Sequence, residues 1–333
     1  MRHRPLLDGA RALAILFVLL HHGQLLPLGL GSAGGTVGVT AMFVLSGYLI
    51  TALLLSEMEA TDTVDPRAFY LRRIRRLIPA FAIVVVTSAV ILVALGRPML
   101  ALLSSLGAAS LVGNWLLAGG FPLGPLAHTW FLAIEAQFYV TWPLAIVPLV
   151  SQLGRGRLAG LLVLGALGVT IARTVALASG WSIQRVGYAT EFQADGLMIG
   201  CALALAAPRI RLPRVAIAGG VAGLIALTLS PMTVATWPLT MVAAAALVAG
   251  SFGPNDRFVG PILASAPVVY LGQISYGIFL WHYPLMWHLD LIAGPRHPLL
   301  ALGVIAITLV IAGTSHRWVE RSFLSGRLIP RRA

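Results

Sequence analysis

The chain has 333 residues, of which 58% are hydrophobic and only 10% are charged, and its mean hydropathy is +0.90. A soluble chain would carry roughly 25% charged residues, so the composition excludes an ordinary soluble globular protein and indicates lipid as a solvent. The net charge is +12, and all 23 basic side chains are arginine. They lie in short clusters between apolar stretches, as in the cytoplasmic loops of membrane proteins, which disfavours nucleic-acid binding. The single cysteine, Cys201, excludes an intramolecular disulfide and a thiolate metal cluster.

Long apolar stretches follow one another along the whole chain, and a spanning helix needs about 20 such residues. The first stretch contains His21 and His22 and has no convincing cleavage site, so we interpret it as a retained span and not as a signal peptide. The pattern predicts an all-α, polytopic integral membrane protein with about ten transmembrane helices, folded as a single domain over residues 1–333. The stretches lie near 11–30, 36–56, 78–96, 99–118, 129–150, 159–179, 188–207, 215–231, 236–252, 268–292 and 298–315.

Arginine clusters indicate which stretches cross the membrane. If the clusters and the N-terminus are cytoplasmic, as the positive-inside rule predicts, one stretch cannot cross. We expect this to be 99–118, which is rich in Gly and Ser, because a re-entrant segment is tolerated where protein covers its backbone. Both termini are then cytoplasmic, with a short tail from about residue 316. The clusters comprise Arg67, Arg72, Arg73, Arg75 and Arg76, then Arg155 and Arg157, then Arg209, Arg211 and Arg214, and in the tail Arg317, Arg321, Arg327, Arg331 and Arg332.

Ionisable residues inside spanning helices are costly and are functional candidates by default. Arg11 and His22 share the first stretch, and their spacing puts them on one helix face, roughly 16 Å apart along the axis. Arg11 would lie near the inner surface and His22 well inside the membrane. The structural alternative is a membrane-edge anchor for Arg11 and an interhelical hydrogen bond for His22, and the spacing alone favours it. His21 points about 100° away and is a weaker candidate.

Glu135 and a cluster of arginines are the next candidates. Glu135 is a lone carboxylate in an apolar stretch, so it either pairs with a cation or is protonated. Clustered guanidinium groups suit phosphates through bidentate hydrogen bonds, although a positive-inside bias explains the same pattern equally well. The cluster precedes the third stretch and consists of Arg72, Arg73, Arg75 and Arg76.

Several weaker candidates lie further along the chain. Arg173 lies in the middle of an apolar stretch and needs a carboxylate partner. Asp195 and Glu191, one turn earlier, could line a cavity. We expect His128 to be a helix-end residue, while His282, among aromatic residues, fits a structural role as well as a functional one.

Many of these residues lie in blocks that resemble the membrane acyltransferase-3 family. LDGARALAILFVLLHH (7–22) resembles the opening of the family, in which ten residues separate an Arg from a His. Phe131 and Ala136 stand where the family often has Ser and a second Glu, and Gln193 replaces a common Arg. The later blocks follow in the family's order: GVTAMFVLSGYLI (38–50), RRIRRLIPAF (72–81), HTWFLAIEAQFY (128–139), ADGLMIGCALA (194–204), LGQISYGIFLWHYPL (271–285) and SHRWVERSFL (315–324).

The resemblance implies a membrane-embedded O-acyltransferase that moves an acyl group, usually acetyl from acetyl-CoA, to a hydroxyl of a glycan, sugar, lipid or macrolide-type acceptor. It implies no permanently bound cofactor and no metal site, and we expect no extramembrane transferase domain after the last block. A neutral His could take the proton of the hydroxyl or carry the acyl group itself. Carried over residue by residue, the catalytic pair is His22 and Arg11, supported by Glu135, and the acyl-CoA phosphates meet Arg72, Arg73, Arg75 and Arg76.

A proton-coupled membrane transporter is the alternative function, because it would also explain buried His, Glu and Asp residues. However, the sequence shows no pair of related halves with interrupted helices, the usual sign of a secondary transporter. It also shows no Gly-rich phosphate loop of the nucleotide-binding kind. Release of free CoA from acetyl-CoA that depends on His22 would distinguish the enzyme from the transporter.

Overall fold

The computed structural model describes residues 4–26, 32–207, 210, 212, 215–252, 258–293 and 298–320. Every regular element in these ranges is helical, which confirms the predicted all-α class. Helices satisfy their backbone hydrogen bonds within one segment, as lipid requires. The predicted cytoplasmic arginines Arg209, Arg211 and Arg214 and the tail beyond residue 320 lie outside the described residues.

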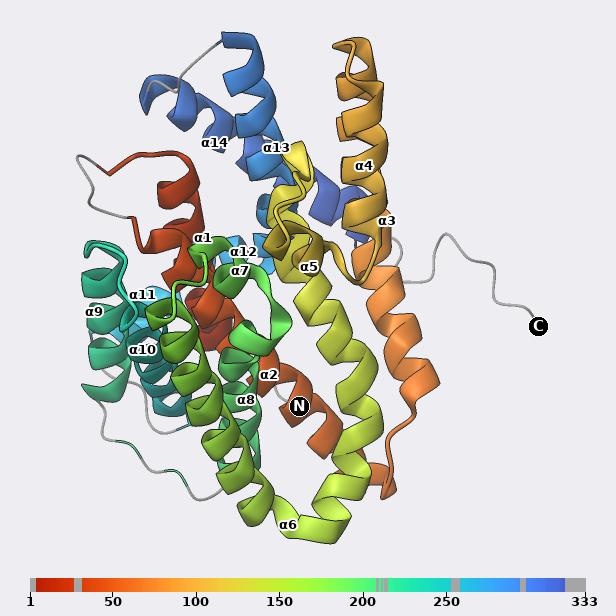
Figure 1. Cartoon of the computed structure of the whole chain (residues 1–333). Coiled ribbons are helices and arrows are strands. Elements are labelled where there is room, and N and C mark those ends of the chain that lie inside the picture. Colours follow the sequence, from red (N-terminus) through yellow and green to blue (C-terminus); the bar gives the residue numbers. More distant parts are fainter. Residues whose placement is uncertain are drawn as a thin grey trace. The chain divides into compact units, whose positions relative to one another are not determined.

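The helices form two compact units, each built from two separate stretches of the chain and each described here by itself. Unit 1 consists of Met1–Val64 and Thr141–Gln273, and unit 2 of Asp65–Val140 and Ile274–Ala333. Figure 1 labels most of the helices. In chain order they are α1 (Pro5–His22), α2 (Gly34–Thr61), α3 (Pro66–Ala94), α4 (Pro98–Ala109), α5 (Gly113–Ala118), η1 (Gly124–Thr129), α6 (Trp130–Ala178), α7 (Ile183–Tyr188), α8 (Thr190–Ala206), α9 (Val215–Thr228), α10 (Thr236–Gly250), α11 (Val259–Leu263), α12 (Ala266–Gln273), α13 (Ser275–Ala293), α14 (Pro298–Ser315) and η3 (His316–Glu320).

By length and composition, five helical stretches in the described ranges can cross a membrane. The longest, Gly124–Ala178, exceeds the length of one crossing, and α6 within it bends at Gly154, whose φ of 72° and ψ of 156° are not helical. The chain is therefore an integral membrane protein, whereas the number of about ten crossings stays a prediction. The other four stretches are Pro5–His22, Gly34–Thr61, Pro66–Ala94 and Pro298–Glu320.

The stretch 99–118 forms two short helices, α4 and α5, and not one continuous helix. The 12 residues of α4 rise about 18 Å, which is less than the roughly 30 Å of a hydrocarbon core. The chain turns back after α4, so closely that a Cβ at Gly113 would collide with the carbonyl oxygen of Gly107. The stretch is therefore not a single continuous span, as its Gly and Ser content predicted.

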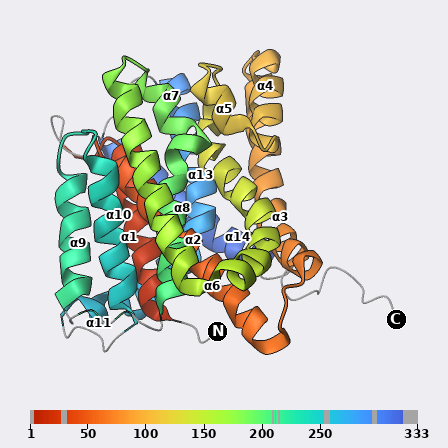
Figure 2. The same cartoon turned by 60° about the horizontal axis from the view of Figure 1, so that its bottom comes forward.

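Glycines let the helices of unit 1 approach one another closely. Where α2 crosses α8, a Cβ at Gly47 would collide with the backbone of Leu197, and a Cβ at Gly200 with the backbone of Val44. Gly196 and Gly200 have the GxxxG spacing that brings helices together in membranes. The helices α9 and α10 also pack together, and they lie side by side in Figures 1 and 2. Because lipid supplies no hydrophobic driving force between helices, such close van der Waals contact stabilises the unit.

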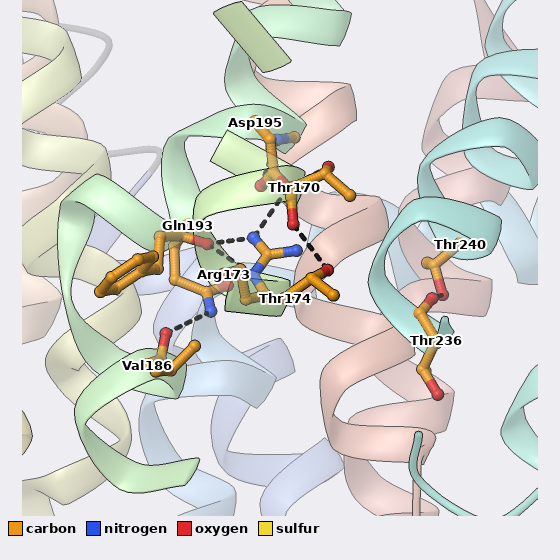
Figure 3. A network of polar contacts seen from close by, with 10 residues as sticks. Thr170, Arg173, Thr174, Val186, Gln193, Asp195, Thr236 and Thr240 are labelled. Atoms are coloured by element: carbon orange, nitrogen blue, oxygen red, sulfur yellow. Dashed lines mark hydrogen bonds and ion pairs between the residues drawn. The ribbon is translucent and has the colours of Figure 1, made fainter. Parts of the chain in front are cut away.

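A buried ion pair lies in the core of unit 1 (Figure 3). Nη2 of Arg173 on α6 is 2.7 Å from Oδ2 of Asp195 on α8, and the two side chains are 1% and 2% exposed. Arg173 also donates from Nε to the carbonyl oxygen of Phe192 at 3.0 Å, and its guanidinium lies over the ring of Trp237. Asp195 accepts a second hydrogen bond from the backbone N–H of Gly196 at 3.0 Å. The pair joins α6 to α8 and neutralises two charges that would be costly alone in lipid.

This network confirms the prediction that Arg173 has a carboxylate partner. It also shows that the carboxylate of Asp195 is used within the protein and does not simply line a cavity. Glu191, one turn earlier on α8, forms an exposed ion pair with Arg185. Asp195 is therefore a structural residue of the unit 1 core.

Asp195→Asn should lower the free energy of unfolding by about 3–5 kcal/mol, because it leaves the buried guanidinium of Arg173 without a charged partner. Glu191→Gln is the matched control, since it removes a carboxylate from the same helix but from an exposed pair worth about 0–1 kcal/mol. Thermal unfolding of the purified protein in detergent measures both changes. Equal unfolding midpoints for the two variants would contradict the structural role of the buried pair.

Candidate active site

The first half of α1, in unit 1, holds an ion pair between Arg11 and Asp8. Nη1 of Arg11 lies 2.9 Å from Oδ1 of Asp8, and Asp8 is buried. Residues three apart share one face of a helix, so this pair needs no other element to form. The backbone at Asp8 packs so closely on α12 that Gly272 has no room for a Cβ, and Gly9 packs in the same way on α11. Arg11 is therefore oriented by a carboxylate at a fixed place in the unit.

His22 is the last residue of α1 and lies roughly 16 Å from Arg11 along the helix axis. The helix ends there, and Gln24 adopts a left-handed φ of 51°. The predicted apolar stretch ran on to residue 30, so the expected position of His22 well inside a spanning helix is wrong. His22 instead lies at the end of the helix, about 26 Å along the axis from Pro5.

The two neighbouring histidines of α1 have different surroundings. The ring of His21 packs against α2 so closely that it leaves no room for a Cβ at Gly35. The ring of His22 lies 5.2 Å from that of His21 between centroids, at an interplanar angle of 68°. His21 therefore contributes to helix packing, and His22 is the better candidate for chemistry.

Unit 2 contains a half-open cavity of about 540 Å³, counted with its mouth. Side chains of α3, α4, α6 and α13 line it, and most of them are apolar. The carboxylate of Glu135 is part of the lining, and the residue is 9% exposed. Small-molecule sites typically enclose about 300–1,000 Å³, so the cavity has the size of a ligand site. Glu135, predicted from its isolation in an apolar stretch, thus lies at a cavity.

Polar groups from several elements surround Glu135. The hydroxyl of Tyr276, which also lines the cavity, donates to the carbonyl oxygen of Leu77 at 2.7 Å. Tyr276 lies within electrostatic reach of Glu135, Glu320 and Arg76. Glu320 is itself buried, and its Oε2 is 3.1 Å from Nδ1 of His316. Two carboxylates and a guanidinium therefore share one neighbourhood in unit 2.

One wall of the cavity is the turn between α4 and α5. Ser110 and Leu111 in this turn line the cavity. Gln137 of α6 holds the turn, because its Nε2 donates to Oδ1 of Asn114 at 2.9 Å and also to the carbonyl oxygen of Leu111. Asn114 is fully buried. A pair of side-chain amides therefore fixes this wall.

The predicted phosphate-binding arginines lie near the start of α3. The helix begins where the side chain of Asp65 accepts a hydrogen bond from the N–H of Ala68 at 3.1 Å. The guanidinium of Arg73 lies over the rings of Phe69 and Tyr139, 5.4 Å from each centroid, and Tyr139 lines the cavity. Arg73 is therefore placed beside the cavity.

The four arginines of the cluster have different environments. Arg76 acts on Tyr276 in the cavity wall, whereas Arg72 is exposed and Arg75 has a buried Nε without a hydrogen-bond partner. The structure thus brings Arg73 and Arg76 together with Glu135 in unit 2. Arg11 and His22 belong to unit 1, where they share α1.

Two histidines are buried together elsewhere in unit 2. His128 lies in η1, directly before α6, which confirms the expected helix-end position. Its ring centroid is 5.6 Å from that of His282 and 5.2 Å from that of Tyr283. Nδ1 of His282 lies 2.8 Å from the carbonyl oxygen of Phe279, so this nitrogen carries the proton and donates. Within the described ranges, no three His, Cys, Asp or Glu side chains could hold a metal ion.

Asp8, Tyr276 and Glu320 were absent from the site predicted by sequence. The spacing of Asp8 and Arg11 was a readable signal, since residues three apart meet on a helix. Tyr276 and Glu320 gave no such signal. The hydrogen bond from Tyr276 joins residues 199 positions apart in sequence, which no local pattern predicts.

Comparison with known proteins places the chain among acyltransferases. A family model described as an acyltransferase domain matches residues 4–316. A putative peptidoglycan O-acetyltransferase of Bacillus subtilis (strain 168) is 33% identical over 353 residues, and a peptidoglycan O-acetyltransferase of Listeria monocytogenes is 31% identical over 350 residues. An O-acetyltransferase of Staphylococcus aureus (strain NCTC 8325) is 29% identical over 351 residues. No solved structure matches the chain.

The alignments are unequal in coverage. Each covers 96% of this chain, but they cover 55%, 55% and 57% of the three relatives, so the chain spans a little over half of their length. The family match, in contrast, extends across both units and includes almost every block that carried the resemblance. The resemblance is confirmed, and the chain belongs to the acyltransferase-3 family of integral membrane proteins.

Proposed function

We propose that the protein transfers an acyl group, acetyl among them, from acyl-CoA to a hydroxyl of a cell-surface glycan. The observation that carries this proposal is the placement of Glu135 at a cavity with Arg73 and Arg76 beside it. Guanidinium groups bind phosphates through charge-assisted hydrogen bonds, and the mostly apolar cavity suits an uncharged part of the same donor. The names of two relatives, both peptidoglycan O-acetyltransferases, support a glycan acceptor.

The proposed reaction forms an ester bond between the acceptor oxygen and the acyl carbonyl carbon, and breaks the bond from that carbon to the CoA sulfur. The hydroxyl proton passes to a base, and the departing thiolate takes up a proton and leaves as the CoA thiol. His22 is the proposed base, or alternatively the residue that carries the acyl group between donor and acceptor. Arg11, oriented by Asp8, supplies a fixed positive charge, and Glu135 supports the reaction from the cavity.

The proposed orientation has both termini in the cytoplasm. The arginines at the start of α3 then meet acyl-CoA at the cytoplasmic surface, in agreement with the positive-inside rule. In this orientation α1 runs outward from Pro5, and His22 lies at its outer end. A glycan outside the cell could therefore approach His22 without entering the hydrocarbon core.

Replacing Arg72 and Arg76 together by Ala should raise the KM for acetyl-CoA at least about tenfold, since a hydrogen bond to a charged group contributes about 1.5–3 kcal/mol. Arg67→Ala is the matched control, because it removes an exposed arginine of the same helix outside the cluster. Release of free CoA by the protein in nanodiscs gives both values. A KM that stays the same in the double variant would assign the cluster to membrane orientation alone.

His22→Ala should lower the transfer rate by about two to four orders of magnitude, the usual effect of losing a general acid–base group. His21→Ala should be much milder in rate, because its ring packs on α2 and does no chemistry. Turnover is measured as acyl transfer with acetyl-CoA and peptidoglycan fragments, alongside the unfolding midpoint of each variant. Full turnover in His22→Ala, together with a loss in a folded His21→Ala, would show that the wrong histidine has been chosen.

A further inference from the structure

The mouth of the unit 2 cavity lies on an apolar outer surface. Ile78 of α3 and Leu111 after α4 both line the cavity, and they are 50% and 49% exposed. The same faces continue with exposed apolar side chains, among them Val86 on α3 and Leu106 on α4. In a membrane protein such a surface faces lipid, because it has no favourable place in water. The cavity therefore opens sideways, towards hydrocarbon.

The interior of the cavity has room for more than an acetyl group. Small side chains, Ala108, Ala133 and Ala136, form part of the lining between the larger Phe81 and Leu132. An acetyl group would fill only a small fraction of about 540 Å³. An apolar space that a ligand leaves unfilled gains no van der Waals contact, so the space favours a longer apolar occupant.

The charges beside the cavity indicate which apolar molecule fits. Arg73 and Arg76 precede the cavity-lining Leu77 and Ile78 on the same helix. A ligand with phosphates at the arginines and a hydrocarbon chain one turn further along α3 matches both features. Glu135 and Tyr276 in the wall provide polar contacts between these two ends. A neutral hydrocarbon would leave the arginines unused.

We propose that the cavity binds the acyl chain of the donor, and that the enzyme uses acyl-CoA donors with acyl groups longer than acetyl, whose ends reach towards lipid. This inference rests on the proposed acyl-CoA-dependent function. The chain takes no part in bond exchange, which occurs at the thioester carbon. Its burial in the cavity holds the thioester in place, so that binding improves with each methylene that leaves water.

The test compares the binding of acetyl-CoA and octanoyl-CoA to the full chain in nanodiscs, with empty nanodiscs to subtract partition into lipid. Octanoyl-CoA should bind at least about tenfold more tightly, since burial of a few methylenes suffices for that factor. Ala136→Leu fills the cavity from α6 and should remove most of this advantage. The readout is the ratio of the two dissociation constants in one preparation, so a partial loss of folded protein cancels.

Two further variants keep the result specific. Ala109→Leu narrows the cavity at an exposed position, where folding is little affected, and should lower the ratio in the same direction. Ala82→Leu adds the same side chain to the exposed face of α3 outside the cavity and should leave the ratio unchanged.

The outcomes separate this inference from the proposed function. Binding of acetyl-CoA without any octanoyl advantage, or an advantage that survives in Ala136→Leu and Ala109→Leu, overturns the inference and leaves acyl-CoA as the donor. Binding of neither acyl-CoA overturns the proposed donor and the inference with it. A cavity occupied by a membrane lipid chain would show the first of these patterns.

Discussion

Lipid cannot solvate a charge, so a buried charge of this chain needs a partner inside the protein. Arg173 and Asp195 meet this requirement across two helices, with exposures of 1% and 2%. Arg11 and Asp8 meet it within a single turn of α1. Once such partners are fixed, the helices that carry them cannot slide or rotate without breaking a pair that costs several kcal/mol to leave open. The positions of the candidate catalytic groups follow from this restriction.

Close packing of backbones makes the pairing possible. Gly47, Gly196 and Gly200 let α2 and α8 touch, and the same α8 carries Asp195. Side-chain contacts across such crossings depend on van der Waals contact, since the lipid is as apolar as the helix surfaces. The polar core of unit 1 and its glycine contacts are thus parts of one arrangement.

The sequence was informative wherever the reasoning concerned a single helix or a cost in lipid. It predicted the helical class, the interruption of 99–118, the carboxylate partner of Arg173 and the isolation of Glu135. It overestimated the length of the first helix, because hydropathy continues past Gln24 while the backbone turns there. It did not predict the neighbourhood of Tyr276, since contacts between residues far apart in sequence depend on how several helices pack.

The turn between α4 and α5 has a consequence for how sites of this kind diversify. It forms a wall of the cavity, yet it is attached to α6 through the amides of Gln137 and Asn114 and not through a long helix–helix interface. Substitutions at Ser110 and Leu111 can therefore reshape the wall while the long membrane-crossing helices keep their contacts. Selection on ligand shape could act on a few loop positions, with little cost to insertion or stability, and related chains could differ in ligand while sharing the same helical framework.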